Sequence, residues 1–88
     1  MYRIRFKQEL YSYMINILTD ELKNKIENIE YKDDVVYLNI DVDTKLDIME
    51  YVEDKQLEIG FVNEDYLNED GKKLQMIYDI IYNQTNSQ

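Results

Sequence analysis

The chain has 88 residues, of which 19 are acidic and 10 basic, and it contains no Cys, His, Trp or Pro. A chain of this length supports a single hydrophobic core, because about 60–65% of its unfolded surface can be buried on folding. No stretch approaches the roughly 20 apolar residues of a membrane-spanning helix, and residues 1–10 lack the apolar run of a secretory signal. We therefore expect one cytoplasmic domain over residues 1–82 and a disordered polar tail over residues 83–88.

The first half of the chain predicts a strand, a helix and a hairpin. Residues 2–7 alternate apolar and basic side chains, which is typical of a half-buried strand. Residues 9–25 carry apolar side chains at helical spacing, with Thr19 as a point where this helix would divide. Residues 28–42 alternate again on both sides of the polar turn 32–34, so we expect a hairpin there.

The second half predicts a helix, a strand and a last helix. Thr44 and Asp47 match a capping box, and the helix that they begin should end near residue 55. Residues 56–62 indicate a fourth strand, or else an irregular extension of that helix, and a last helix should begin near residue 70. This order predicts an α+β fold of the ferredoxin-like (βαββαβ) type, an antiparallel sheet with helices on one face, plus a C-terminal helix.

The residue types exclude most catalytic chemistry. Without His or Cys, the common zinc, copper, haem and iron–sulfur ligand sets and the Cys–His or Ser–His nucleophiles are missing. The only two glycines, Gly60 and Gly71, form no phosphate-binding loop, and a calcium-binding EF-hand centred on Gly71 lacks its first and last ligands. We therefore expect no enzyme, no metal and no cofactor.

The negative charge is concentrated in one segment. Residues 41–70 contain eleven acidic residues against two lysines, so their net charge of −9 equals that of the whole chain. Like charges one helical turn apart destabilise a helix by around 0.2–0.5 kcal/mol per pair, so a stripe of them favours a functional explanation. On the predicted second helix, four acids recur at i, i+4, i+7 and i+11: Asp43, Asp47, Glu50 and Asp54.

Two interpretations of this acidic stripe compete. It is either a solvated face that keeps a small protein soluble, or a surface that imitates nucleic-acid phosphates and occupies a basic groove of another protein. In the second case Tyr51 would be an aromatic anchor, and the loop around residues 64–70 would add charge. The residues expected to bind the partner are then Asp43, Asp47, Glu50, Tyr51, Asp54, Glu64 and Asp65.

A basic face lies at the opposite pole of the predicted fold. Arg3, Arg5 and Lys7 share one side of the first strand, which is central in a ferredoxin-like sheet, and Tyr37 lies on the same face. Such a face suggests binding of single-stranded RNA, but a net charge of −9 opposes contact with nucleic acid. We favour cross-strand pairing of Arg3 or Arg5 with Asp41, or a contact between subunits.

In size and charge the chain resembles phage-encoded inhibitors of host defence, including anti-CRISPR and anti-restriction proteins. Ile, Lys, Asn and Tyr supply 36 of the 88 residues, a composition typical of AT-rich bacterial and phage genes. The resemblance implies a small inhibitor that binds a basic nucleic-acid-handling host protein and contacts neither nucleic acid nor membrane directly. The alternatives are a structural or regulatory homo-oligomer, such as a phage assembly factor or a homodimer joined through the sheet face, and a small-ligand-binding domain.

Overall fold

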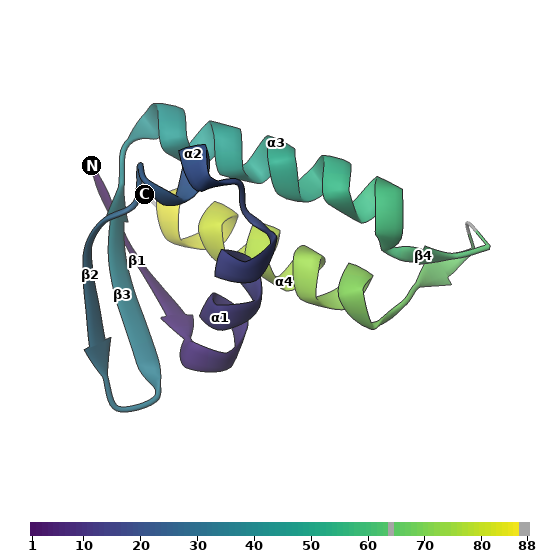
Figure 1. The fold of residues 1–88 in the computed structure, drawn as a ribbon, viewed down its shortest axis with the longest axis horizontal. Helices are drawn as coiled ribbons and strands as arrows, with labels where there is room; N and C mark the ends of the chain where they lie inside the picture. Colours follow the sequence, from purple (N-terminus) through teal and green to yellow (C-terminus); the bar gives the residue numbers. More distant parts are fainter. Residues whose placement is uncertain (64, 87–88) are drawn as a thin grey trace.

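A three-stranded antiparallel sheet carries the helices on one of its faces (Figure 1). The computed structural model describes residues 1–63 and 65–86. The sheet has the strand order β1-β3-β2, with β1 (Tyr2–Lys7), β2 (Glu27–Lys32) and β3 (Val35–Ile40). The helices are α1 (Gln8–Ile17), α2 (Asp20–Lys23), α3 (Val42–Ile59) and α4 (Glu69–Thr85). A short ribbon of β4 (Phe61–Val62) and β5 (Tyr66–Leu67) joins α3 to α4 at the end of the molecule away from the sheet.

The alternation of apolar and polar residues in β1 and β3 puts one face of the sheet on the core, which confirms the predicted pattern. Ile4 pairs with Leu38, and Phe6 pairs with Val36. All four side chains are at most 1% exposed. The residues between them along each strand point to the opposite, open face, because side chains alternate across a strand.

The hairpin predicted for residues 28–42 is also confirmed. Lys32 of β2 pairs with Val35 of β3 across a two-residue turn. Asp33, in that turn, has a φ of 59°. This left-handed conformation is one that Asp adopts more readily than most residues, so the turn closes without a glycine.

The helix predicted over residues 9–25 divides in two at the position of Thr19. The chain becomes extended at Leu18, and the hydroxyl of Thr19 accepts the backbone N–H of Leu22 at 3.2 Å. This bond caps α2 at its N-terminus. Leu18 and Leu22 both remain buried, so the break redirects the chain toward α3 without leaving the core.

The predicted ferredoxin-like fold is wrong, because the expected fourth strand is helical. Leu57 and Ile59 belong to α3, which continues to Ile59 instead of ending near residue 55. Only Phe61–Val62 form a strand, and it pairs with Tyr66–Leu67 rather than with the main sheet. In consequence the sheet has three strands, and β1 lies at its edge instead of its centre.

Local helix propensity explains the longer α3. Residues 53–58 read Glu-Asp-Lys-Gln-Leu-Glu, mostly good helix formers, and the alternation at residues 57–61 is too short to outweigh them. The helix also begins earlier than predicted. The side chain of Asp41, rather than that of Thr44, caps it by accepting the N–H of Thr44 at 2.7 Å, and Thr44 is buried inside the first turn.

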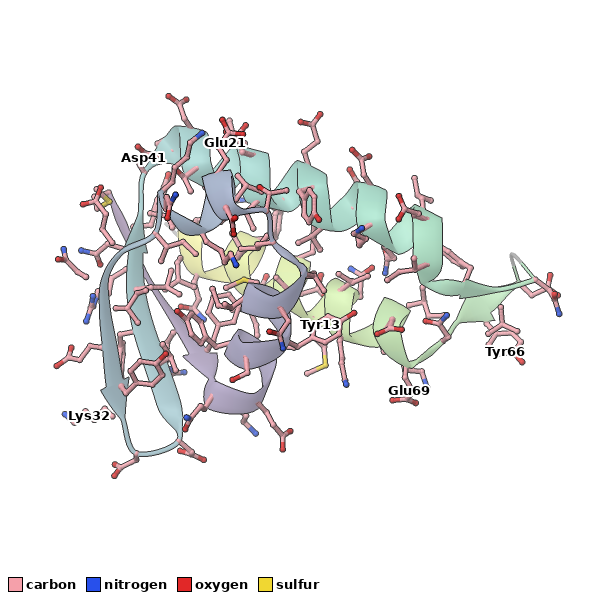
Figure 2. All side chains as sticks on the ribbon, in the orientation of Figure 1. Tyr13, Glu21, Lys32, Asp41, Tyr66 and Glu69 are labelled. Atoms are coloured by element: carbon pink, nitrogen blue, oxygen red, sulfur yellow. The ribbon has the colours of Figure 1, made fainter. Side chains whose placement is uncertain are left out.

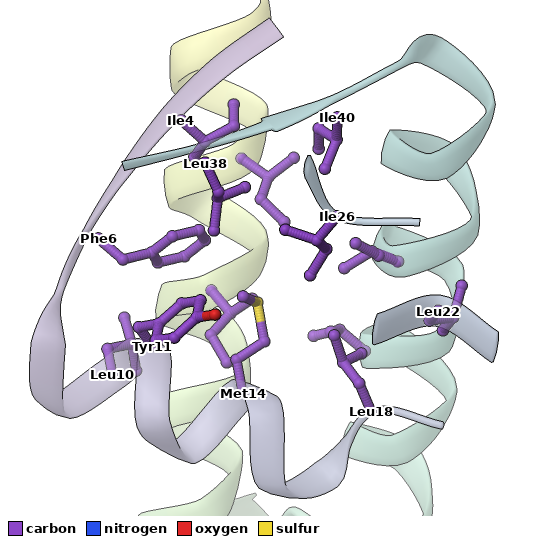
Figure 3. Packing of buried hydrophobic residues seen from close by; sticks show 14 of the residues in the cluster. Ile4, Phe6, Leu10, Tyr11, Met14, Leu18, Leu22, Ile26, Leu38 and Ile40 are labelled. Atoms are coloured by element: carbon purple, nitrogen blue, oxygen red, sulfur yellow. The ribbon is translucent and has the colours of Figure 1, made fainter. Parts of the chain in front are cut away.

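The core lies between the sheet and the helices, and Figure 3 shows its packing. Phe6, Tyr11 and Met14 meet where β1 and α1 face one another. Leu74, Ile77 and Ile81 form the buried stripe of α4, which contacts β1, α1 and α3. Among the described residues no helix is long and apolar enough to span a membrane.

Helices α3 and α4 cross at the only two glycines of the chain. A Cβ atom at Gly71 would overlap the carbonyl oxygen of Gly60, and one at Gly60 would lie 2.9 Å from the Cα of Gly71. Asn68 fixes the crossing by donating its backbone N–H to the Gly60 carbonyl at 2.9 Å and its side-chain amide to the Ile59 carbonyl at 2.7 Å. Gln56 donates to the Gly71 carbonyl at 3.0 Å. The glycines are therefore needed for close approach, since neither has a positive φ.

The last turn of α4 closes one edge of the sheet. The side-chain amide of Gln84 accepts the backbone N–H of Arg5 at 2.8 Å and donates to the Arg5 carbonyl at 2.9 Å. These bonds satisfy the outward-pointing backbone groups of Arg5, in the middle of the β1 edge. Residues 83–85, assigned from the sequence to a tail, are thus part of α4, whereas residues 87 and 88 lie outside the described residues.

The close contact of Gly60 and Gly71 predicts that replacing Gly71 by alanine lowers the stability of the protein, the opposite of the usual effect in a helix. In a helix Ala is more favourable than Gly by about 1 kcal/mol. Gly71→Ala should instead lower the free energy of unfolding by about 2–4 kcal/mol in urea titrations, because its Cβ forces α3 and α4 apart. Lys72→Ala, at the next and exposed position, is the control and should change stability by less than about 0.5 kcal/mol. Unchanged or higher stability of Gly71→Ala would contradict the close contact.

Two tyrosines of α1 predict a loss of stability at high pH. The Tyr13 hydroxyl donates to Asp70 on α4 at 2.9 Å, and the Tyr11 ring packs edge-on against Tyr31 on β2. Burial, and then the Asp70 carboxylate, raise the pKa of Tyr13 to about 12, and burial followed by the Tyr31 phenol raises that of Tyr11 to about 12. Because these values exceed the unfolded value of about 10, the stabilisation is present below pH 10 and is lost as the pH rises toward 12.

The raised pKa values of Tyr11 and Tyr13 can be measured by following tyrosinate absorbance in the ultraviolet as the pH is raised. We expect two of the nine tyrosines to ionise last, and Tyr13→Phe to remove one of these two late steps. Ionisation of Tyr11 and Tyr13 near pH 10, while far-ultraviolet circular dichroism still shows a folded chain, would contradict the expectation.

Candidate functional site

The outer side of α3 carries the acidic stripe as predicted from the spacing. At 100° per residue its members lie within about 60° of one another, opposite the buried Ile48 and Val52. All of them are exposed. The acidic stripe consists of Asp43, Asp47, Glu50 and Asp54.

Helix α2 lies beside α3 and adds to this surface. A shallow hollow of about 370 Å³ separates the two helices, with Thr19, Leu22 and Lys25 on its α2 side. Figure 2 shows Glu21 of α2 next to α3. Four carboxylates line the hollow, namely Glu21, Asp47, Glu50 and Asp54. The sequence analysis did not include Glu21 in this surface. The predicted break at Thr19 indicates that a separate helix begins before Glu21, but it does not indicate that this helix packs against α3.

Few cations neutralise these carboxylates. Lys25 contacts Asp47 at 3.5 Å, and among the described residues no ion pair engages Asp43, Glu50 or Asp54. Of the two lysines of α3, only Lys45 is turned away from the hollow, since Lys55 lies 5.7 Å from the centre of the Tyr51 ring that lines it. Lys45 donates to Asn86 at 3.2 Å and lies over the Tyr2 ring, while Lys55 contacts Glu58 at 3.3 Å. That contact with Glu58 raises the pKa of Lys55. The acidic stripe therefore keeps most of its charge.

Exposed apolar side chains run along α3 beside the acidic stripe. At 100° per residue Val42, Leu46 and Leu57 fall on an adjoining line of the helix. Their exposed fractions are 51%, 55% and 71%. We call these three residues the apolar stripe. The exposed Glu53 falls on the same line between Leu46 and Leu57, so the outer side of α3 combines carboxylates with separate apolar side chains.

Of the remaining predicted partner-binding residues that the structure describes, Tyr51 lies beside the acidic stripe and Asp65 lies apart from it. The Tyr51 hydroxyl donates to the Ile17 carbonyl at 2.6 Å, which ties α3 to the end of α1, although the ring still lines the hollow. Asp65 is exposed on the β4–β5 ribbon, beyond the C-terminal end of α3. Glu64 lies outside the described residues. Asp65 therefore does not belong to the surface that the acidic stripe forms with the hollow.

On the open face of the sheet, Arg3 is paired with a carboxylate of the same chain. Arg3 contacts Glu30 at 2.7 Å, donates to the Asn39 side chain at 3.0 Å and lies over the Tyr37 ring at 5.4 Å. The expected pairing of Arg3 or Arg5 with Asp41 is therefore wrong. β1 is an edge strand and reaches Glu30 across β3, whereas the capping bond to Thr44 engages Asp41 and lowers the pKa of its carboxyl.

A second hollow lies on the other side of α1. The hollow at the start of α1, about 580 Å³, is the larger of the two and is lined by Lys7, Gln8, Glu9, Ser12 and Asp34, without a base hydrogen-bonded to the serine. No group of three or more acidic side chains in residues 1–63 and 65–86 is arranged to hold a metal ion. The acidic hollow between α2 and α3 is the better candidate, since four carboxylates and a single lysine, Lys25, line it.

Comparison with known proteins adds no functional information: no family model, curated protein or solved structure matches this chain.

The hydrogen bond of Tyr51 predicts a structural role for its hydroxyl. Tyr51→Phe keeps the ring in the hollow but leaves the Ile17 carbonyl without its partner, and should lower the free energy of unfolding by about 1–2 kcal/mol. Thermal or urea unfolding measures this loss. Tyr82→Phe, on an exposed ring, is the control and should be neutral. If Tyr51→Phe unfolds like the parent protein, the bond to Ile17 contributes nothing.

Proposed function

We propose that the protein is a small acidic inhibitor that binds a basic nucleic-acid-handling protein through the outer side of α3. The observation that carries the proposal is the acidic stripe, of whose members only Asp47 has an ion-pair partner among the described residues, with Glu21 of α2 beside it. In this function the carboxylates occupy the groove that nucleic acid would otherwise fill. The protein contacts neither nucleic acid nor membrane, and performs no reaction.

The carboxylates of α3 and α2 together approach the charge density of a phosphate chain. With a rise of about 1.5 Å per residue, the four acids from Asp43 to Asp54 extend over roughly 16 Å. One strand of a duplex presents a phosphate every 3.4 Å of its axis, so α3 alone is less densely charged. Glu21 raises the local density at the hollow. A groove that binds phosphates would attract this surface over a Debye length of about 10 Å at 0.1 M salt.

The apolar stripe supports the proposal that this side of α3 binds another protein rather than only solvent ions. Leu57 is 71% exposed and Leu46 is 55% exposed, next to the carboxylates. Burying such side chains stabilises a complex by roughly 25 cal/mol per Å² of apolar surface, which charge alone does not supply. A bacterial cytoplasm, where such partners meet nucleic acid, is the proposed setting, and the phage origin rests on composition.

Two matched triple variants test the proposal. The site variant carries Asp47→Asn, Glu50→Gln and Asp54→Asn. The control variant carries Glu9→Gln, Glu69→Gln and Asp79→Asn, exposed positions on α1 and α4 with the same change in net charge. Each protein is immobilised and exposed to nuclease-treated bacterial lysate, and retained proteins are quantified by mass spectrometry.

We expect the parent and the control to retain the same nucleic-acid-binding protein, and the site variant to retain at least about tenfold less. Three exposed charge interactions of about 0.5–1 kcal/mol each account for a loss of this size. Retention should also fall between about 0.1 and 0.5 M salt. Equal retention by all three proteins, with circular dichroism showing that each is folded, would refute the proposal.

A competition assay with the purified retained protein then distinguishes mimicry from binding elsewhere. The parent protein should displace a labelled oligonucleotide of the kind that the partner binds, and the site variant should need roughly tenfold more protein. A ternary complex of the protein, its partner and the oligonucleotide would contradict occupation of the groove.

A further inference from the structure

The two edges of the main sheet differ in how they are finished. Gln84 covers the β1 edge by bonding both backbone groups of Arg5. All six residues of β2 are exposed, and Figure 1 shows β2 at the opposite rim of the sheet, with no further strand beside it. An open edge presents unpaired N–H and C=O groups, which are a template for another strand.

The bonds of Gln84 also fix which groups of β2 face outward. Because the N–H and C=O of Arg5 point away from β3, those of its partner Tyr37 point toward β2. Glu30 pairs with Tyr37, so its own backbone groups point back toward β3. By alternation, the N–H and C=O of Tyr31 point to the open rim.

The charges beside Tyr31 would pair with opposite charges if two copies of β2 lay antiparallel. Glu30 and Lys32 lie on the open face of the sheet, because their partners Tyr37 and Val35 do. Tyr31 lies on the helix-covered face, where it is 60% exposed and packs edge-on against Tyr11. A two-fold axis at Tyr31 would place each Tyr31 opposite its copy and each Glu30 opposite Lys32 of the other copy.

We propose that two copies of this chain associate through the β2 edges, with the antiparallel pairing centred on Tyr31, to form one six-stranded sheet. Two Glu30–Lys32 pairs form across the contact, and Tyr31 loses much of its exposure. Centring the axis on Glu30 or on Lys32 instead would oppose like charges, which destabilises a strand pair. This inference is independent of the acidic stripe, which lies on α3.

The short length of the β2 edge and the net charge of each chain limit the affinity of the dimer. The register of β2 shifts between Glu27 and Glu30, and the turn follows at Asp33, so only a short segment is straight enough to pair. Each chain carries a net charge of −9, which opposes association until salt screens it. We therefore expect a weak dimer, seen at roughly millimolar and not at micromolar concentration in about 0.15 M salt.

Charge-reversal variants test the pairing by sedimentation equilibrium. Glu30→Lys alone and Lys32→Glu alone each place like charges opposite one another and should abolish the dimer. Lys32→Glu is the more specific of the two, because Glu30→Lys also removes the bond between Glu30 and Arg3 of the same chain. The variant with both changes restores opposite charges and should dimerise like the parent. An equal mixture of the two single variants should form a heterodimer, because one supplies two lysines and the other two glutamates.

Hydrogen exchange of the Tyr31 amide provides a second measurement on the unaltered chain. Its exchange rate should slow at least threefold from dilute to roughly millimolar protein, while the already bonded Arg5 amide stays constant. A parent protein that remains monomeric at millimolar concentration overturns the proposal. So does a dimer that Lys32→Glu leaves intact, or one whose formation does not slow the Tyr31 amide.

Discussion

The contact between Gly60 and Gly71 is the constraint on which the arrangement of the second half of the chain depends. With no Cβ on either residue, the end of α3 and the start of α4 meet backbone to backbone. This close crossing returns α4 along α3, so that Leu74, Ile77 and Ile81 reach the core that the sheet began. It also carries the last turn of α4 to β1, where Gln84 closes the edge. One of the outer edges is thereby removed from pairing, and the other is left open.

The same crossing determines which side of α3 meets solvent. Because Ile48 and Val52 pack inward against the core, the acidic stripe and the apolar stripe point outward together. The like charges of the acidic stripe cost the helix stability, and packing of its opposite side offsets that cost. The proposed inhibitor function uses this outward side, whereas the proposed dimer uses the rim of the sheet. Both surfaces are available at once, so a dimer would present two acidic stripes.

Local patterns were interpreted correctly where a few neighbouring residues decide the conformation. The strand at residues 2–7, the hairpin around Asp33 and the helix break at Thr19 are of this kind. The interpretation was wrong at residues 56–62, where a short alternation competed with strong helix formers. It was also wrong for Asp41, because two candidate caps, Asp41 and Thr44, stand within one turn and only the backbone decides between them. The loss of one strand then moved β1 from the centre of the sheet to its edge.

The sequence by itself determined the acidic stripe, since the members of a helix face follow from spacing alone. It also determined which faces of β1 and β3 are buried, because alternation has a period of two. Only the tertiary structure decided that Glu21 joins Asp47 at one hollow, that Arg3 meets Glu30 across β3, and that Gln84 closes β1. Each of these contacts joins residues 25 or more positions apart. Local periodicity cannot predict such contacts, because they depend on how the helices and strands pack around the core.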